Sequence, residues 1–196
     1  AKNYIKTVVN MFKNYVSVIA WNICAIKAGW TPDLVKIVNE LIQYIRDTLK
    51  SKKFITITTE FFDNIPNDLL VDFISADIGL INSKEEYSSK VSELTLKANL
   101  SPKPIMLADY YAIGKQIACA DESDMDSLIN QSQIVQEALE KLGTSKELMG
   151  YSLGILNDYY IEETIQEFNF SGILDAYRNV KPATTIVEQY LAKQRK

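Results

Sequence analysis

The side chains of this sequence that could do chemistry are carboxylates, lysines, tyrosines and two cysteines, because the chain contains no histidine. Without imidazole, it lacks the commonest general base, the commonest transition-metal ligand and the side chain that titrates near neutral pH. Catalysis would have to use the remaining groups. Carboxylates that lie close together in the chain are therefore the first candidates for such chemistry.

The densest acidic run spans residues 121–126, with the sequence Asp-Glu-Ser-Asp-Met-Asp. Clustered carboxylates suit calcium or magnesium. An EF-hand loop that began at Asp121 or Asp124 would also need a glycine at its sixth position and a glutamate at its twelfth, and neither register supplies both. The run also opens a predicted helix, where acidic side chains complement the helix dipole. We therefore interpret it as a helix start.

A second acidic group falls on a predicted helix near the end of the chain. Its i,i+4 spacing is compatible with a cation site but is typical of a solvated helix face, and a helical di-metal site would need Glu-x-x-His motifs. The group consists of Asp158, Glu162, Glu163 and Glu167. The sequence therefore predicts no metal ligands and no catalytic residues.

Two glycine motifs do not indicate a nucleotide site. Gly114 and Lys115 lack the preceding glycine, the strand and the following serine or threonine of a phosphate-binding loop. Gly150 and Gly154 stand one helical turn apart, which favours a close helix crossing. No cofactor is predicted.

Eleven tyrosines are many for a chain of this length. Two adjacent pairs, Tyr110-Tyr111 and Tyr159-Tyr160, would point in different directions on a helix, because neighbouring residues are about 100° apart. One tyrosine of each pair could then face a partner, and tyrosine is enriched at protein interfaces. Together with Ile55 and Ile57, these pairs are the predicted protein interface.

Basic residues gather in two short clusters that could contact a nucleic-acid backbone if the fold brings them together. The clusters are Lys50, Lys52 and Lys53, and Lys193, Arg195 and Lys196. The total charge of -4 argues against general polyanion binding. Arginine is also scarce, which leaves few side chains for bidentate phosphate contacts.

The 196 residues, 47% of them hydrophobic, predict one domain over residues 1–196. Cys24 and Cys119 lie in apolar contexts and are predicted to be free thiols, which favours a cytoplasmic or other intracellular compartment. No run reaches the ~18–20 apolar residues of a membrane span.

Helical spacing of apolar residues predicts an all-α bundle of about eight or nine helices. Helix-capping residues support several of the helix starts, including Thr31 with Pro32 and Ser83 with Glu86. The predicted helices cover residues 4–27, 32–49, 66–80, 83–98, 103–120, 123–142, 145–168 and 185–193, with a short element at 172–177.

The stretch FITITTEFF, residues 54–62, is the exception, because its β-branched residues suit a strand. A lone strand would leave its backbone groups unpaired, so it would need a partner on another chain or near residues 168–170. We favour an extended linker over 54–58 that leads into a short helical turn capped by Thr58 or Thr59. A true strand remains the alternative.

These features predict a protein that is not an enzyme. The main hypothesis is a helical structural or protein-interaction protein that self-associates or belongs to a larger viral or ribonucleoprotein assembly. The alternative is a nucleic-acid-associated helical subunit that uses the lysine clusters. The expected partners are therefore protein chains, with nucleic acid second.

Overall fold

The computed structural model describes residues 2–112, 122–142, 144–151, 159–160, 168–169, 173–174 and 178–194; within these ranges, the side chains at 109–111, 122–124, 142, 159–160 and 168–169 lie outside the description. The chain forms two compact units. Unit 1 comprises Ala1–Asp77, Leu96–Met106 and Glu147–Met149, and unit 2 comprises Ile78–Thr95, Leu107–Lys146 and Gly150–Lys196. Each unit is considered by itself below.

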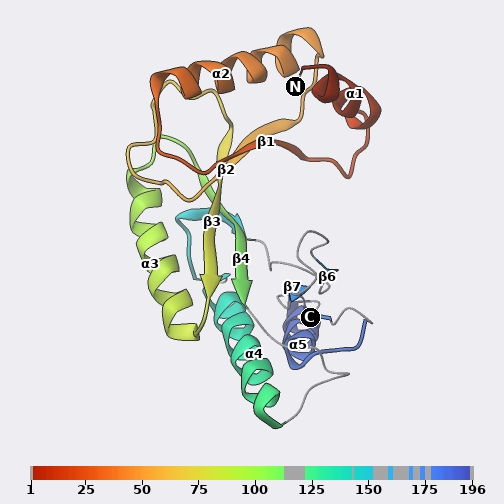
Figure 1. Cartoon of the computed structure of the whole chain (residues 1–196), viewed down its shortest axis with the longest axis vertical. Helices are drawn as coiled ribbons and strands as arrows, with labels where there is room; N and C mark the ends of the chain where they lie inside the picture. Colours follow the sequence, from red (N-terminus) through yellow and green to blue (C-terminus); the bar gives the residue numbers. More distant parts are fainter. Residues whose placement is uncertain are drawn as a thin grey trace. The chain divides into compact units, whose positions relative to one another are not determined.

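Strands and helices follow one another along the described chain (Figure 1). The helices are α1 (Lys2–Phe12), α2 (Pro32–Gln43), α3 (Lys84–Leu100), α4 (Glu122–Leu142) and α5 (Pro182–Gln194), and a π-helical turn, η1 (Tyr44–Thr48), extends α2. The strands are β1 (Ala20–Ile26), β2 (Phe54–Thr59), β3 (Phe73–Ile81), β4 (Ile105–Ala112), β5 (Leu148–Tyr151), β6 (Tyr159–Tyr160) and β7 (Phe168–Asn169).

The main sheet contains five strands in the order β1-β2-β3-β4-β5, and β2 pairs in parallel with both β1 and β3. This sequential order is the order found in (βα) barrels, whereas doubly wound sheets reverse direction at a switch point. A separate antiparallel pair joins β6 to β7. The fold is therefore α/β, and the all-α prediction of eight or nine helices is wrong.

Strand β2 is the FITITT part of the stretch that looked out of place in the sequence. Residues 55–59 are all buried, because both faces of the strand are covered and both edges are paired within the chain. β-Branched residues suit such a position. The preferred prediction of an unpaired linker is wrong, and so is the expectation of a partner on another chain. Thr59 does cap a turn, since its hydroxyl accepts the Phe61 N–H at 2.9 Å, but no helix follows.

Four predicted helices prove to contain strands. The segments 4–27, 66–80, 103–120 and 145–168 include β1, β3, β4 and β5 to β7, respectively. Strands buried on both faces form nearly continuous apolar runs, and such runs contain apolar residues at helical spacing by chance. In each case, pairing with another strand, rather than the local spacing of apolar residues, determined that the segment contains a strand.

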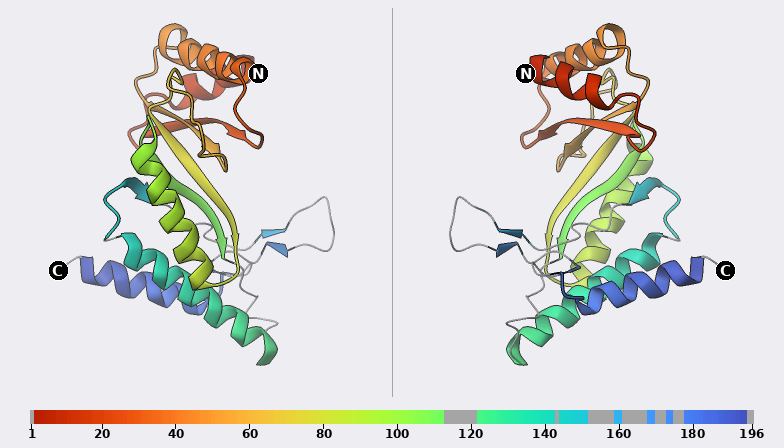
Figure 2. Two further views of the ribbon diagram at one scale, coloured as in Figure 1. Left: turned by 90° about the vertical axis from the view of Figure 1, so that its left-hand side faces the viewer. Right: turned by 90° about the vertical axis from the view of Figure 1, so that its right-hand side faces the viewer.

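The starts of α2, α3 and α4 were predicted correctly, whereas the capping pattern of Thr144 with Glu147, which predicted a helix over 145–168, precedes the strand β5. In α2, the hydroxyl of Thr31 accepts the Leu34 N–H and Pro32 occupies the first turn. Helix α4 begins at Glu122, so the acidic run does stand at a helix start. Helix α5 begins at Pro182, three residues before the predicted cap at Thr185. In unit 2, α4 and α5 lie side by side (Figure 2) and share a core of Val135, Leu139, Ala183 and Val187.

The start of α3 shows a capping arrangement in which Glu86 takes part. The Ser83 hydroxyl accepts the Glu86 N–H at 3.2 Å, and the Glu86 carboxylate accepts the Asn82 N–H at 2.8 Å. The Asn82 N–H first, and then Lys90, lower the pKa of Glu86 below its ordinary value. The ionised form of Glu86 therefore stabilises the fold.

We expect Glu86→Gln to reduce the free energy of unfolding at neutral pH by less than about 1 kcal/mol, because the group is partly exposed. A lowered pKa gives stability that is present above the ordinary glutamate value of about 4.3 and is lost as the pH falls through the lower folded value. Urea unfolding followed by circular dichroism at neutral and acidic pH tests this. Glu85→Gln is the control, because Glu85 is exposed and approaches only Lys84, at 4.0 Å. An equal effect of both variants at neutral pH contradicts the prediction.

No helix in the described part of the chain is long and apolar enough to cross a bilayer.

Candidate functional site

A row of charged side chains crosses the sheet in unit 1, directly after the carboxyl ends of β1 and β2 and in the middle of β3. In the parallel register, Ile26 lies opposite Thr59, and Thr59 lies opposite Ala76. The next residue of each strand or of its extension is Lys27, Glu60 or Asp77. We call these three residues the carboxyl row. Active sites of (βα) barrels form at this end of the strands.

The ammonium of Lys27 bridges the two carboxylates of the carboxyl row. Its Nζ lies 3.1 Å from Oδ2 of Asp77 and also donates to Oε1 of Glu60. The Asp77 side chain is 8% exposed, whereas those of Glu60 and Lys27 are 47% and 61% exposed. The row therefore has one buried carboxylate and one carboxylate that faces solvent.

Lys27 is fully charged in this arrangement. Its hydrogen bond to Glu60, followed by its hydrogen bond to Asp77, raises the pKa of Lys27 above its ordinary value. The described residues contain no group of three or more histidine, cysteine or acidic side chains that could hold a metal. The single ammonium of Lys27 thus forms ion pairs with both carboxylates of the row.

Below the carboxyl row, the same face of the sheet carries polar side chains. The Thr56 and Ser75 hydroxyls are hydrogen-bonded at 2.9 Å, and the Asn22 amide donates to the Thr58 hydroxyl at 2.6 Å. Thr56, Thr58 and Ser75 are all buried. A barrel interior is usually filled by branched aliphatic residues. Here the hydroxyls of Thr56 and Ser75 bond to each other and that of Thr58 accepts from Asn22, which fixes the side chains next to the carboxyl row.

Paired carboxylates at the carboxyl end of a sheet can serve acid–base or nucleophilic chemistry. Both carboxylates of the carboxyl row accept hydrogen bonds from one ammonium, so their bonded oxygens lie no further apart than two hydrogen-bond lengths. This spacing allows both to contact one bond of a substrate.

The residues predicted as a protein interface lie in several places. Ile55 and Ile57 are 0% exposed in the central strand, so neither offers surface to a partner. Tyr110 and Tyr111 belong to β4, and Tyr159 with Tyr160 forms β6. The side chains of these four tyrosines lie outside the described set, so their role at an interface stays a prediction.

The predicted basic clusters stay a prediction as well. Lys50 and Lys52 are exposed just before β2, and Lys53 donates to the Tyr15 carbonyl at 2.8 Å. Lys193 is exposed in the last turn of α5, while Arg195 and Lys196 lie outside the described residues. The two clusters belong to different units.

Sequence reasoning missed all three residues of the carboxyl row. The acidic group at 158–167 and the motif at Gly114 and Lys115, which it considered instead, lie outside the described residues. A usable signal existed in β2, where a β-branched run ends directly at Glu60. The carboxyl row was missed because Lys27 and Asp77 fell within predicted helices. Only the pairing of the three strands brings Lys27, Glu60 and Asp77 together.

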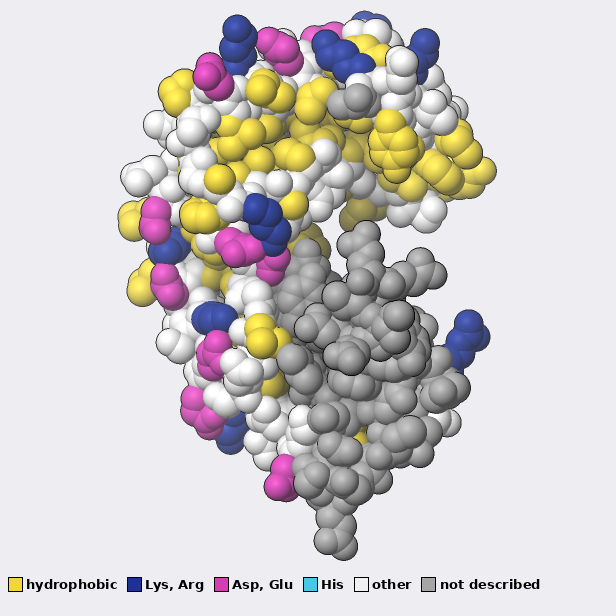
Figure 3. Space-filling view, viewed as in Figure 1, with side chains coloured by type: hydrophobic (Ala, Val, Ile, Leu, Met, Phe, Trp, Pro, Cys, Tyr) yellow, Lys and Arg dark blue, Asp and Glu magenta, His cyan; other side chains and the backbone are white. Residues whose placement is uncertain are grey.

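An exposed apolar patch lies on unit 1 beside α1. Figure 3 shows hydrophobic side chains gathered over α1 and the segment that follows it. The patch consists of Met11, Phe12, Tyr15, Val16 and Ile19, of which Val16 is 92% exposed. The rings of Phe12 and Tyr15 contact each other at 5.6 Å between centroids. Contiguous exposed apolar patches of this kind often mark interaction surfaces.

No protein-family model matches the sequence, and no curated protein matches it. Solved structures do share its fold. A β-glucuronidase from an uncultured Clostridium species is similar with a TM-score of 0.73 and 20% identity, over 97% of this chain and 36% of that one. A GH2 β-galacturonidase from Eisenbergiella tayi bound to galacturonate gives a TM-score of 0.69 and 15% identity, over 97% and 36% of the two chains.

A β-glucuronidase from Ruminococcus gnavus is also similar, with a TM-score of 0.72 and 16% identity over 94% of this chain and 34% of that one. The chain thus spans about a third of the length of these proteins. At such identities the likeness concerns the fold alone. The predictions of a non-enzymatic helical protein and of its nucleic-acid-associated helical alternative are contradicted, since the shared fold is α/β and the similar structures are described as glycosidases.

Proposed function

We propose that this chain takes part in glycoside hydrolysis at the carboxyl end of β1, β2 and β3. The observation that carries the proposal is the carboxyl row, in which Lys27 holds a buried and an exposed carboxylate together. The fold neighbours, described as β-glucuronidase and β-galacturonidase, support the reaction class. Glycosidases generally use two carboxylates that flank the scissile bond.

The spacing of the two carboxylates favours a retaining reaction. Retaining enzymes place their carboxyl groups about 5–5.5 Å apart, and inverting enzymes about 6.5–9.5 Å apart. Glu60 and Asp77 both accept from Lys27, which suits the shorter separation. In a retaining reaction, one carboxylate of such a pair acts as the nucleophile and the other as the acid and then the base.

The first experiment measures release of nitrophenol from a panel of nitrophenyl glycosides, beginning with the β-glucuronide and β-galacturonide. We expect turnover of at least one member, since the row provides both carboxylates. Turnover of none, together with no binding of any member in calorimetry, would count against the proposal.

Contact with another protein chain is a further proposal, and the apolar patch supports it. We expect Val16→Asp with Ile19→Asp to lower any self-association by about tenfold or more, because each change places a charge in an apolar contact. Light scattering after size-exclusion chromatography measures this. Leu96→Asp is the control, because Leu96 is 68% exposed outside the patch. If the double variant associates as the unaltered protein does, the patch is not the contact surface.

An intracellular location also stays a proposal. It is supported by Cys24, which is a free thiol whose pKa is raised by burial.

A further inference from the structure

We propose that a cavity beside the carboxyl row binds further sugar rings of a neutral oligosaccharide, an inference that rests on the proposed hydrolysis. The cavity has a volume of about 700 Å³ and belongs entirely to unit 1. Ligand pockets typically measure about 300–1,000 Å³. Helix α2 forms one wall, and the connection between β2 and β3 forms the other.

The connection between β2 and β3, residues 60–72, departs from the pattern of the fold. Parallel strands are usually joined by a helix. No helix occurs in this connection, although all its residues are described. Long loops without secondary structure inside a compact unit are commonly functional. This loop begins at Glu60, and three of its residues, Asn64, Pro66 and Asp68, line the cavity. It therefore connects the carboxyl row to the pocket along the chain.

One hydrogen bond links the lining of the cavity to a residue next to the carboxyl row. Trp30, which lines it, lies three residues after Lys27 on the connection from β1 to α2. Its indole N–H donates to the carbonyl of Phe61 at 3.1 Å, and Phe61 follows Glu60. A residue that lines the pocket is therefore hydrogen-bonded to the residue that follows Glu60. A chain of sugars with one ring at the row can place the next ring against Trp30.

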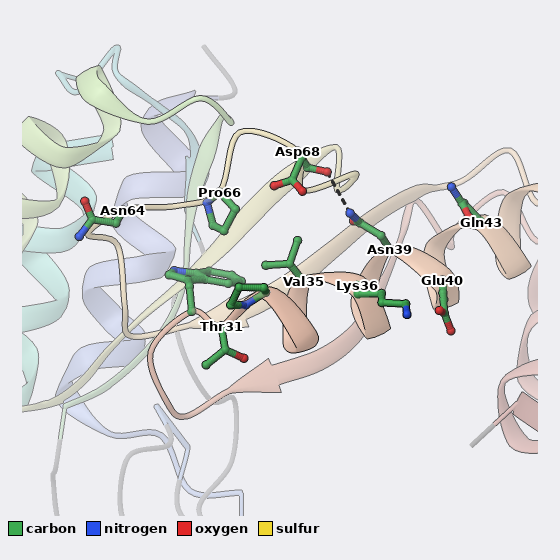
Figure 4. Close-up of a pocket in the computed structure, with 11 residues that line it drawn as sticks. Thr31, Val35, Lys36, Asn39, Glu40, Gln43, Asn64, Pro66 and Asp68 are labelled. Carbon is green, nitrogen blue, oxygen red and sulfur yellow. Dashed lines mark hydrogen bonds between the residues drawn. The ribbon is translucent and has the colours of Figure 1, made fainter.

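The two walls are held together by Asn39. Its amide donates to the Asp68 carbonyl at 2.9 Å, and its side-chain oxygen accepts the Leu70 N–H at 2.8 Å. Figure 4 shows Asn39 on α2 reaching Asp68 on the loop, with Val35 and Pro66 on the two walls. The pocket is thus preformed, and binding does not have to order the loop.

The lining combines apolar surface with side chains that have no hydrogen-bond partner within the described part of the chain. Trp30, Pro32, Val35 and Pro66 supply the apolar part. Among the described residues, the side chains of Lys36, Glu40, Gln43 and Asn64 have no hydrogen bond or ion pair. A pyranose has apolar C–H faces and a rim of hydroxyls that both donate and accept. An aromatic face with amides and charged groups around it matches that pattern.

The charges of the lining argue for a neutral ligand. The charged side chains of the lining are one ammonium, that of Lys36, and two carboxylates, those of Glu40 and Asp68. A phosphate or another anion would need an excess of positive groups. The lining therefore recognises hydroxyls rather than charge.

Asn64 has a backbone φ of 58°, which side-chain-bearing residues seldom adopt. Asparagine tolerates this conformation better than most residues, and glycine adopts it freely. Asn64→Gly should therefore keep the loop conformation and remove only the amide. Asn67→Gly is the matched control, because Asn67 lies in the same loop and shares a second cavity with Asn64 but does not line the proposed sugar pocket.

The test uses the two tryptophans of the chain as separate reporters. In a Trp21→Phe protein, Trp30 alone emits, and we expect saturable fluorescence changes with neutral oligosaccharides such as cellotriose, xylotriose or mannotriose. In a Trp30→Phe protein, Trp21 should show no change. Asn64→Gly in the Trp21→Phe background should weaken binding by about tenfold, whereas Asn67→Gly should not.

The outcomes separate this inference from the proposed hydrolysis. If nitrophenyl glycosides are hydrolysed but no oligosaccharide changes Trp30 emission, the subsite is wrong and the hydrolysis stands. If Trp30 responds but no glycoside is hydrolysed, the pocket stands and the reaction is wrong. A response from Trp21 alone, or equal weakening by Asn64→Gly and Asn67→Gly, also overturns the subsite.

Discussion

Asp77→Asn is expected to lower kcat/KM for glycoside hydrolysis by about 10²- to 10⁴-fold, the usual contribution of a positioned acid or base. Asparagine keeps the shape of the side chain but cannot carry the charge that pairs with Lys27. Steady-state kinetics on the best nitrophenyl glycoside measures the effect, with circular dichroism to confirm folding. Glu60→Gln should cause a loss of similar size, because the reaction needs both carboxylates.

The matched control for Asp77→Asn is Asp72→Asn. Asp72 is also an ion-paired aspartate, with its Oδ1 2.7 Å from Arg46, but it precedes β3 at the opposite end of the strand. Its carboxylate also accepts the Ile55 N–H at 2.7 Å. Residues at that end of barrel strands contribute to stability. Asp72→Asn should therefore lower stability and leave kcat/KM of the folded protein nearly unchanged. Equal kinetic losses in both variants would show that the carboxyl row has no special role.

Ile57→Ala is expected to lower the free energy of unfolding by about 2–5 kcal/mol, the usual cost of truncating a fully buried isoleucine. Ile57 is 0% exposed and lies opposite Ile74 in the paired register of β2 and β3. Urea unfolding followed by circular dichroism measures the loss. The expected effect is large because the surrounding strands are held by backbone pairing and cannot close the space fully.

Phe54→Ala is the control on the same strand, because Phe54 is 59% exposed. Exposed positions usually change stability by about 0.5 kcal/mol or less. The comparison also tests the earlier interface hypothesis for Ile55 and Ile57. If these residues met a second chain, the stability lost in Ile57→Ala would depend on protein concentration. A small loss that varies with concentration would contradict the central position of β2.

Local signals predicted the starts of three helices, although the capping pattern of Thr144 with Glu147 precedes a strand. Thr31 with Pro32, Ser83 with Glu86 and the acidic run at 121–126 identified the starts of α2, α3 and α4 to within about two residues. Caps work at this level because the bonds they supply join residues a few positions apart. The same locality explains why the tyrosine and lysine clusters could be proposed as surfaces but not placed.

The strands and the carboxyl row could not be predicted in the same way. FITITT showed the β-branched composition of a strand, but its partners are residues 20–26 and 73–76, far away in the chain. In β1 and β3, burial on both faces removed the alternation that identifies strands. No sequence motif joins Lys27, Glu60 and Asp77. These residues meet only in the folded sheet, so their chemistry requires no fixed spacing along the sequence.

By itself, the sequence determined the capped helices, the strand-forming composition of residues 54–59 and the absence of histidine chemistry. The tertiary structure alone decided that residues 54–59 form a central strand, and that one ammonium and two carboxylates meet at its end. The physical reason is range. Caps and composition act through neighbouring residues, whereas parallel pairing and charge contacts depend on which distant segments the folded sheet places side by side.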